Sequence, residues 1–260
     1  MAAIKIASLN VGRLFHNNPK GSLGLLMSSE WDVICLQDVP SYVIEKPEFG
    51  RRWPVQHFAP MTKHLMGGAR VPVGIGIFST HPFQSTSAHA YVGNVLPVLD
   101  LDGVTVSSAG NAAPHDLTLV RATESRLAIF AEVAVGEVVF KIGTTHGVWV
   151  PGGKVDDHQR KSMARLHEIM QDQGGMVMMG DFNATRGGEI YDLIARGFID
   201  CIPYTFKNSV DWVNRGKEGG PDLLVDHVFT DRFATYGVEN VRLQFGVSDH
   251  AAIFATIRKD

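Results

Sequence analysis

The stretch Met176-Val-Met-Met-Gly-Asp-Phe-Asn-Ala184 is the starting point for predicting the fold. An apolar run ends abruptly here in Gly180, Asp181, Phe182 and Asn183. If the run is a buried strand, Asp181 and Asn183 share one face and Phe182 lies on the other. Polar groups at the end of a core strand are costly unless they have partners or a task. Taken alone, the segment is equally compatible with a polar strand end that turns into a loop.

Several other strand-like runs also end in polar residues. In chain order, these ends carry Asn10, Asp38, His146, Asp181, Asn183, Asp226, Asp249 and His250. If the ends converge, four carboxylates share one pocket and cannot all stay ionised at close range without a cation. Aspartate and asparagine oxygens suit a hard ion such as Mg²⁺ or Mn²⁺, and a histidine beside an aspartate can stabilise a developing phosphorane. Such a pocket favours the attack of water on a phosphodiester.

Alternation of apolar and polar residues indicates how some of these ends are oriented. In the expected strand 31–38, Leu36 and Asp38 fall on the same face. In the expected strand 138–145, the alternation makes His146 the polar end of a buried row. The side chains of these strand ends therefore have predictable directions, provided that the alternation is not interrupted.

The other elements follow from periodicity and turn residues. Residues 40–70 are expected to form loops and short elements, 84–120 hairpins around Asp102-Gly103 and a loop, and 203–222 a long loop. Further strands are expected at 4–10, 73–79, 127–135, 223–229, 241–245 and 252–257, and helices at 21–29, 157–171 and 188–195. Since strands outnumber helices and hairpins mix with β-α-β pieces, the pattern predicts an α/β sandwich of mixed sheets covered by helices.

Length and composition are typical of an ordinary globular domain. The chain has 260 residues, of which 45% are hydrophobic and 20% charged, so we expect one domain over residues 1–260. The formal net charge of −3 creates no global field that attracts nucleic acid. A polyanionic substrate therefore requires local arginines or a bound cation.

The sequence also indicates the compartment. Cys35 and Cys201 both lie in apolar contexts, which is typical of buried free thiols in a reducing environment. The N-terminus reads as a first strand instead of a signal peptide, and no apolar stretch is long enough to span a bilayer. We therefore expect a cytoplasmic protein, and we expect it to be a monomer.

Motifs in a fixed order connect these strand ends to a known family. They are Ala7-Ser-Leu-Asn-Val11, Cys35-Leu-Gln-Asp38, Gly76-Ile-Phe-Ser79, Thr144-Thr-His146, Gly180-Asp-Phe-Asn183, Val225-Asp-His-Val228 and Ser248-Asp-His250. By these motifs, which run nearly end to end, the chain resembles the endonuclease/exonuclease/phosphatase superfamily, the fold of deoxyribonuclease I. The resemblance implies a four-layer α/β (α+β) sandwich, in which two mixed β-sheets pack face to face with helices on the outer faces.

The resemblance also implies roles for the catalytic residues. Asp181 would orient or deprotonate the attacking water, and Asn183 would bind the scissile phosphate. His250, paired with Asp226, would stabilise the pentacovalent transition state. His146 would hold a phosphate oxygen or assist the leaving group.

By the same resemblance, Asn10, Asp38 and Asp249 would surround Mg²⁺ or Mn²⁺. Two departures from the family pattern concern this metal site. Asp38 stands where the family usually has Glu, and Gly12 stands where many nuclease members carry an acid. Arg126 is a candidate for a contact with substrate phosphate, and a surface salt bridge is the alternative interpretation.

The predicted function is that of a metal-dependent phosphodiesterase acting on nucleic acid, that is, a nuclease. The first alternative is a phosphatase or phosphodiesterase that acts on a small nucleotide or a phospholipid headgroup. The second is a catalytically weakened binding protein of the same fold, which the two departures in the metal site motivate.

Overall fold

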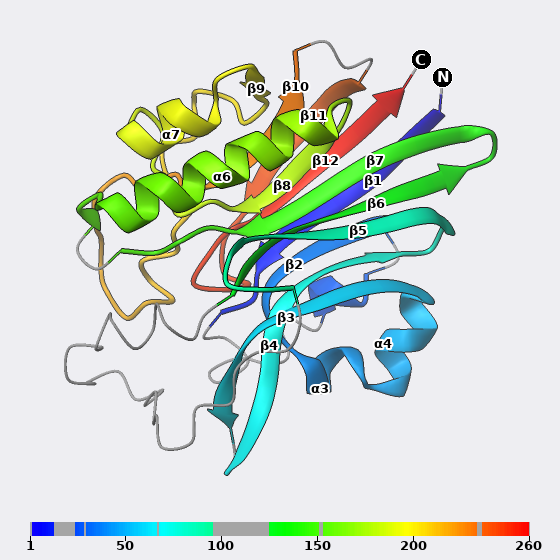
Figure 1. Ribbon diagram of the computed structural model, residues 1–260. Helices are drawn as coiled ribbons and strands as arrows, with labels where there is room; N and C mark the ends of the chain where they lie inside the picture. The colour runs from blue at the N-terminus through cyan, green and yellow to red at the C-terminus, as the bar shows by residue number, and fades with distance from the viewer. Residues whose placement is uncertain are drawn as a thin grey trace.

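Two six-stranded sheets form the centre of the molecule (Figure 1). The computed structural model describes residues 2–12, 24–28, 30–66, 68–95, 125–150, 153–232 and 236–259. The first sheet, in the order β11-β12-β1-β2-β4-β3, consists of β1 (Ala2–Asn10), β2 (Val33–Pro40), β3 (Val55–Met66), β4 (Ala69–Ser79), β11 (Tyr236–Gln244) and β12 (Ala252–Lys259). The second, in the order β5-β6-β7-β8-β10-β9, consists of β5 (Phe83–Val92), β6 (Arg126–Val135), β7 (Val138–His146), β8 (Val177–Asp181), β9 (Phe198–Asp200) and β10 (Asp226–Asp231).

Both sheets are mixed, as expected. The pairs β1–β2 and β7–β8 are parallel, whereas the other pairs of neighbouring strands are antiparallel. Parallel neighbours end at the same edge of a sheet. The carboxyl ends of β1 and β2 therefore lie together in one sheet, and those of β7 and β8 lie together in the other.

The core is divided into three apolar clusters by the two sheets. The central cluster joins the facing sides of the sheets through residues such as Ile6, Ile77, Ile129, Phe140 and Met179. The helices α6 (Asp157–Gln173) and α7 (Glu189–Ile194) pack on the outer face of the second sheet, and α3 (Ser41–Ile44) and α4 (Pro47–Arg52) pack on that of the first (Figure 1). The predicted four-layer sandwich is confirmed.

The central strands follow the sequence prediction, but the edge strands β3, β5 and β9 do not. β3, where loops and short elements were expected, is a strand of 12 residues. β5 lies at the start of the region 84–120, where hairpins around Asp102-Gly103 and a loop were expected. Within the described residues, each pairs with a single neighbour and stands at a sheet edge, where a weak apolar pattern is expected. Pro60 lies at a register shift in β3, where a missing N–H is tolerated. The hairpin expected around Asp102-Gly103 lies outside the described residues.

Helix α6 begins with a side-chain cap. The side chain of Asp156 accepts a hydrogen bond from the backbone N–H of Gln159 at 2.8 Å. The side chain of Gln159 does not return to the cap residue but donates to the carbonyl of Val148 at 2.9 Å. The buried Gln159 therefore fastens the helix to the segment that follows His146.

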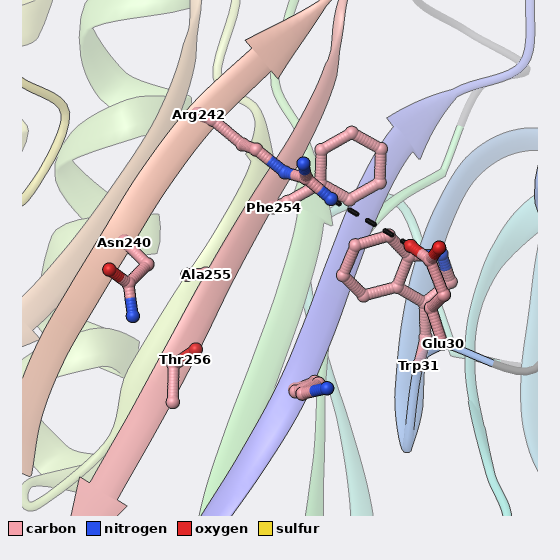
Figure 2. Close-up of a pocket in the computed structure, with 8 residues that line it drawn as sticks. Glu30, Trp31, Asn240, Arg242, Phe254, Ala255 and Thr256 are labelled. Atoms are coloured by element: carbon pink, nitrogen blue, oxygen red, sulfur yellow. Dashed lines mark ion pairs between the residues drawn. The ribbon is translucent and has the colours of Figure 1, made fainter.

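A shallow groove of about 350 Å³ lies over β11, β12 and β1 on the outer side of the first sheet (Figure 2). Its floor contains Trp31 and Phe254, whose rings stack with centroids 4.3 Å apart. The guanidinium of Arg242 lies over both rings and pairs with Glu30 at 3.8 Å. The arginine thus covers the exposed side of the aromatic pair.

A polar cluster is buried on the helix-facing side of β10. Oδ2 of Asp200 accepts hydrogen bonds from Nε of Arg186 at 3.0 Å and from the hydroxyl of Tyr191 at 3.1 Å, and it lies 3.1 Å from Nδ1 of His227. Nε2 of His227 lies 2.9 Å from the carbonyl of Ala184. Burial would raise the pKa of Asp200, but His227 and Arg186 outweigh it and hold the pKa below its usual value. His227 is therefore structural, because both of its ring nitrogens are engaged within this buried cluster.

The first prediction concerns the central cluster. Phe140 is fully buried between the sheets, so Phe140→Ala should lower the free energy of unfolding by about 3–5 kcal/mol. Urea denaturation measures this change. The matched control is Val213→Ala, because Val213 is 77% exposed and its truncation should change stability by less than about 0.5 kcal/mol. A loss below about 1 kcal/mol for Phe140→Ala would contradict a tightly packed interface between the sheets.

The second prediction concerns the free energy of unfolding at low pH. The pKa of Asp200 is lower in the folded than in the unfolded state, so its charge stabilises the fold above the unfolded value of about 3.9. This stabilisation is lost as the pH falls through the lowered folded pKa. Asp200→Asn should cost about 3 kcal/mol at pH 7, with a smaller difference from wild type at pH 3.

Urea denaturation at both pH values tests this expectation. The control is Glu168→Gln, whose side chain is 58% exposed and, among the described residues, forms an ion pair with Arg165 in the same helix. Its stability should stay within about 0.5 kcal/mol of wild type at both pH values. An equal cost for Asp200→Asn at pH 7 and pH 3 would exclude the charge as the cause.

Candidate active site

Three catalytic candidates lie in one row across the second sheet. In the parallel pair β7–β8, His146 is opposite Asp181, and in the antiparallel pair β8–β10, Asp226 is opposite Asp181. The preceding residues of the same faces belong to the central cluster, so the row continues the inner side of the sandwich. Gly180 allows this approach, because a Cβ there would lie 2.3 Å from the carbonyl oxygen of Thr145.

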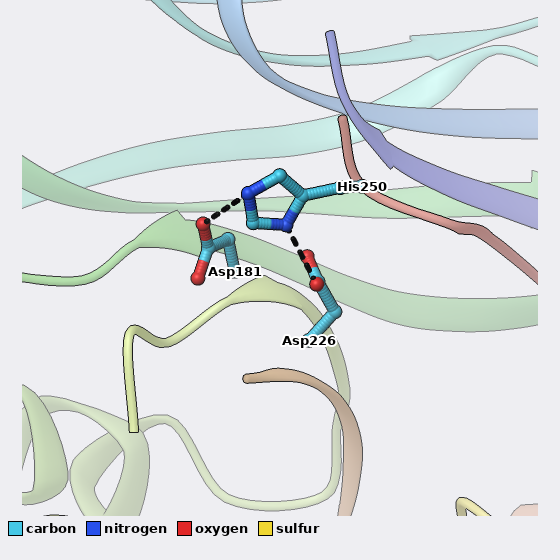
Figure 3. Close-up of side chains that lie close together, drawn as sticks. All are labelled: Asp181, Asp226 and His250. Atoms are coloured by element: carbon cyan, nitrogen blue, oxygen red, sulfur yellow. Dashed lines mark hydrogen bonds and ion pairs between the residues drawn. The ribbon is translucent and has the colours of Figure 1, made fainter. Parts of the chain in front are cut away.

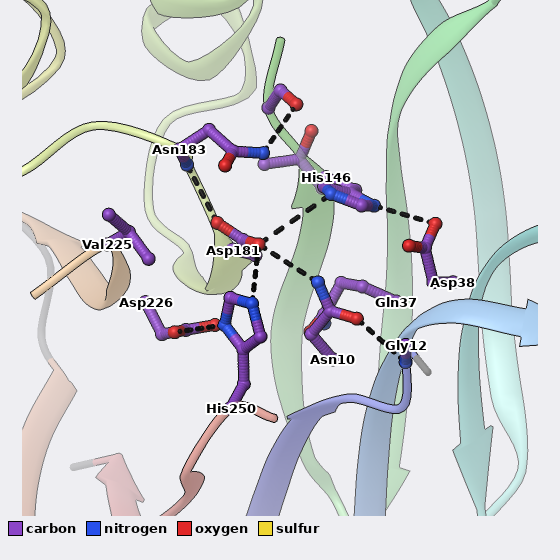
Figure 4. A network of polar contacts seen from close by, with 12 residues as sticks. Asn10, Gly12, Gln37, Asp38, His146, Asp181, Asn183, Val225, Asp226 and His250 are labelled. Carbon is purple, nitrogen blue, oxygen red and sulfur yellow. Dashed lines mark hydrogen bonds and ion pairs between the residues drawn. The ribbon is translucent and has the colours of Figure 1, made fainter. Parts of the chain in front are cut away.

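The first sheet contributes residues from the facing side. Asn10 ends β1, and Asp249 and His250 lie just before β12, the antiparallel partner of β1, with Ala251 between. Figure 4 shows the side chains of Asn10 and His250 directed from these segments toward Asp181. The site therefore lies at one end of the sandwich, between the two sheets.

Asp181 is the centre of the network (Figure 4). Its side chain is almost fully buried, with a relative exposure of the residue of 1%. Oδ2 accepts a hydrogen bond from Nδ2 of Asn10 at 2.9 Å, and Oδ1 accepts one from the backbone N–H of Asn183 at 2.8 Å. Nε2 of His146 and Nε2 of His250 lie 3.6 and 3.7 Å from Oδ2. Two hydrogen bonds and two imidazoles thus compensate the desolvation of one carboxylate.

His250 and Asp226 form a buried pair (Figure 3). Nδ1 of His250 lies 2.8 Å from Oδ2 of Asp226. Burial would lower the pKa of His250, but the carboxylates of Asp226 and Asp181 raise it to about 10. Burial and Asp181 also raise the pKa of Asp226, against the opposing effect of His250. The pair therefore retains a proton at neutral pH, with the imidazole held between two carboxylates.

Asp38 reaches the site through an irregularity in β2. The register of β2 against β4 shifts between Leu36 and Val39, and Asp38 has a φ of 52°. Leu36 packs in the outer cluster, whereas Oδ1 of Asp38 lies 3.0 Å from Nδ1 of His146 in the other sheet. The expectation that Leu36 and Asp38 share a face is therefore wrong. A bulge breaks the alternation and redirects the carboxylate.

The charges around Asp38 hold it ionised. Burial would raise its pKa, but His146 and Arg126 outweigh that effect and lower it well below the usual range. Nη1 of Arg126 also donates to the carbonyl of His146 at 3.4 Å. Arg126 thus lies beside the site, at the start of β6, and not on a remote surface.

Asn183 adopts the left-handed conformation, with a φ of 49°. This turn brings its backbone N–H back to Asp181, and its Nδ2 donates to the carbonyl of Gly147 at 3.0 Å. An amide nitrogen has two hydrogens, so this contact leaves one of them for a ligand.

The predicted metal ligands are partly brought together. A Cβ placed on Gly12 would lie 2.6 Å from Oδ1 of Asp249 and 3.2 Å from Oδ1 of Asn10, so both oxygens converge on the space beside this glycine. Oxygen donors of this kind fit a hard divalent cation. Asp38, the third expected ligand, is instead paired with His146. Among the described residues, ligand atoms of Asp181, Asp226 and His250 also lie within 4.8 Å of one another.

Sequence reasoning missed Arg215, which lies in the expected loop 203–222. Its Nη2 lies 2.9 Å from Nε2 of His250, and its Nε lies 3.3 Å from Oδ2 of Asp249. No periodicity or motif marks this residue, because its position depends on how the loop folds back onto residues 246–251. Lone arginines in Gly- and Lys-containing loops are usually solvated.

The cysteines and the helices add two further observations. Cys35 is buried as expected, whereas Cys201 is only partly buried, and neither forms a disulfide. No helix among the described residues has the length and apolar character needed to cross a membrane.

Comparison with solved structures identifies the fold. No protein-family model and no curated protein matches this sequence. An endonuclease/exonuclease/phosphatase from Bacteroides vulgatus matches with a TM-score of 0.67 and 13% identity over 100% of both chains. A humanized D. rerio TDP2 matches with a TM-score of 0.60 and 16% identity over 99% of both chains.

A mannosyl-6-phosphatase from Bacteroides thetaiotaomicron matches with a TM-score of 0.62 and 13% identity, over 98% of this chain and 99% of that one. At these identities the likeness concerns the fold, and it extends over nearly the whole chain. The protein therefore has the fold of the endonuclease/exonuclease/phosphatase superfamily, as the resemblance in its motifs implied.

Proposed function

We propose that this protein is a metal-dependent phosphodiesterase that hydrolyses nucleic acid. The main support is the buried Asp181 carboxylate, which is flanked by two imidazoles and lies in the same site as the converging oxygens of Asn10 and Asp249. Structures with the same fold carry the names endonuclease/exonuclease/phosphatase and mannosyl-6-phosphatase, which agrees with a reaction at a phosphate ester.

In this proposal Asp181 is the general base. Hydrogen bonds from Asn10 and Asn183 fix its carboxylate, so one oxygen can orient a water molecule and take its proton as the oxygen–phosphorus bond forms. Asn183 donates its remaining amide hydrogen to the phosphate that is attacked.

His250 stabilises the charge that develops on the phosphate. Its raised pKa keeps the ring protonated at neutral pH, and Asp226 fixes the ring through Nδ1. The proton on Nε2 is then available to an equatorial phosphate oxygen. His146, with Arg126 beside it, holds a further phosphate oxygen or assists the departing oxygen when its bond to phosphorus breaks.

The residues around Gly12 fit a divalent cation. Asn10 and Asp249 would hold it, with Asp38 as the third oxygen ligand that the family resemblance implies. Bound Mg²⁺ or Mn²⁺ would polarise the phosphate as a Lewis acid and offset part of its negative charge. Since the chain has a net charge of −3, this neutralisation matters for binding any anionic substrate.

A phosphatase acting on a small phosphomonoester is the second candidate. It is favoured by the mannosyl-6-phosphatase among the similar structures and by the absence of a net positive charge. A substrate panel separates the two: supercoiled plasmid, single-stranded DNA, RNA, bis(4-nitrophenyl) phosphate and 4-nitrophenyl phosphate, each with Mg²⁺ and with Mn²⁺. Preference for the monoester would reject the nuclease assignment. Metal-independent binding without turnover would indicate a weakened binding protein.

The third prediction tests the catalytic residues. Asp181→Ala and His250→Ala should each lower kcat on bis(4-nitrophenyl) phosphate by about 10²–10⁴-fold, because each removes a group that acts in the transition state. Steady-state kinetics with saturating Mn²⁺ measures the change. Asp192→Ala, on the exposed surface of α7, is the control and should retain the wild-type rate. Unchanged rates in both site variants would reject the assignment.

The fourth prediction tests the metal site. Gly12→Ala places a methyl group in the space on which Asn10 and Asp249 converge, so we expect at least a tenfold weaker Mg²⁺ affinity in calorimetry. Gly12 has a φ of 27°, so strain alone must be excluded. Gly136→Ala provides this control, because Gly136 has a φ of 61° but open space around its Cβ position. Equal metal affinity in the two variants would contradict a cation site beside Gly12.

A further inference from the structure

The segment of residues 208–216, here called the strap, is tied to both halves of the catalytic site. The hydroxyl of Ser209 accepts hydrogen bonds from the backbone N–H groups of Val225 at 3.0 Å and Asp226 at 3.1 Å. The backbone N–H of Asp211 donates to the carbonyl of Asp249 at 2.9 Å. The strap therefore bridges the two segments that carry the buried pair of Asp226 and His250.

Hydrogen bonds to the side chain of Asp211 hold the next turn of the strap in position. The buried carboxylate of Asp211 accepts hydrogen bonds from the backbone N–H of Asn214 at 3.0 Å, from its Nδ2 at 2.9 Å and from the N–H of Gly246 at 2.8 Å. Nδ2 of Asn214 also donates to the carbonyl of Ser248 at 2.9 Å. Arg215 follows directly, so its backbone is held against the catalytic segment.

The side chain of Arg215 reaches the atom of His250 that remains available. Nδ1 of this ring is engaged by Asp226, so Nε2 is the nitrogen that can meet a ligand. Nη2 of Arg215 lies 2.9 Å from Nε2. An oxygen within hydrogen-bonding distance of Nε2 can therefore lie within hydrogen-bonding distance of the guanidinium at the same time.

The charge balance of the site also favours the binding of a phosphate oxygen by Arg215. Four aspartates, at positions 38, 181, 226 and 249, surround the space that a phosphate must enter, and their charges repel an anion. The guanidinium is permanently charged and presents five N–H donors in a planar fork that matches phosphate oxygens. Nη2 faces the protonated Nε2 of His250 at 2.9 Å, so donors of both side chains are directed at the same space. Nε lies 3.3 Å from Oδ2 of Asp249, and within the described residues it has no hydrogen-bond acceptor.

We propose that Arg215 binds the phosphate of the substrate together with His250, a role that rests on the phosphoesterase function proposed above. The phosphate oxygen takes a position between Nη2 of Arg215 and Nε2 of His250. A different use of the arginine is to neutralise Asp249 alone, in which case it makes no contact with substrate.

The experiment measures phosphate binding and turnover separately in the full-length protein. Binding of inorganic phosphate is followed by calorimetry with saturating Mn²⁺, and KM and kcat are measured on bis(4-nitrophenyl) phosphate. Arg215→Ala should weaken phosphate binding by about 10- to 100-fold, as expected for the loss of a charged hydrogen bond. Arg215→Lys should lie between Arg215→Ala and wild type, because an ammonium keeps the charge but not the fork.

Chemical rescue gives a readout that a structural role would not produce. Added guanidinium ion should restore part of the phosphate affinity and of kcat/KM in Arg215→Ala. The matched control is Lys217→Ala, in the same loop, since Lys217 is exposed and lies over the ring of Trp212 at 5.4 Å. This control should bind phosphate as the wild type does and show no rescue.

The proposal is overturned if folded Arg215→Ala binds inorganic phosphate as tightly as the wild type, or if only its affinity for Mn²⁺ changes. If Arg215→Ala does not fold, Arg215→Gln and Arg215→Lys still decide the question, because both keep a long hydrogen-bonding side chain. A wild type that binds phosphate but hydrolyses no ester would contradict the proposed function alone, because the phosphate affinities would still test Arg215.

Discussion

The burial of the Asp181 carboxylate is the constraint on which the site depends. A charged group with an exposure of 1% must find compensation from its neighbours. Asn10 and Asn183 donate hydrogen bonds to it, and His146 and His250 lie close to it. These residues come from both sheets, so the carboxylate is compensated only when the sheets are packed together. The site is therefore complete only in the packed sandwich.

A second polar contact across the sheets supports this arrangement. Gln37, which is fully buried, donates from Nε2 to Oγ1 of Thr144 at 2.9 Å, and this joins β2 of one sheet to β7 of the other. Together with the hydrogen bond between Asn10 and Asp181, it fixes the position of the facing strands relative to each other. Buried polar pairs of this type specify one geometry, because other registers would leave donors unsatisfied.

The loop after β9 has little secondary structure, but specific hydrogen bonds hold it in one position. Ser209 and Asp211 use side-chain and backbone hydrogen bonds to join the catalytic segments, and they carry Arg215 to His250. On the far side of β10, the cluster of Asp200, Arg186 and His227 holds the strand from the helix layer. The strand that carries Asp226 is therefore fixed on both of its faces.

The sequence by itself determined the central strands and the direction of most of their polar ends. Period-2 alternation is a local property, so rows such as the one that ends in His146 could be assigned to an inner face before their partners were known. Edge strands were harder to predict, because a strand with one neighbour needs fewer apolar residues, and β3 and β5 show this. The fold as a whole was accessible through the order of the motifs.

Only the tertiary structure decided which strand ends meet and where the residues that depart from the local patterns lie. The row of His146, Asp181 and Asp226 depends on the order of strands in the sheet, which alternation does not encode. Asp38 faces His146 because a bulge interrupts the local period, and Arg215 reaches His250 because a loop folds back over a distance of 35 residues. Both positions result from contacts between residues far apart in the chain, and no local pattern records such contacts.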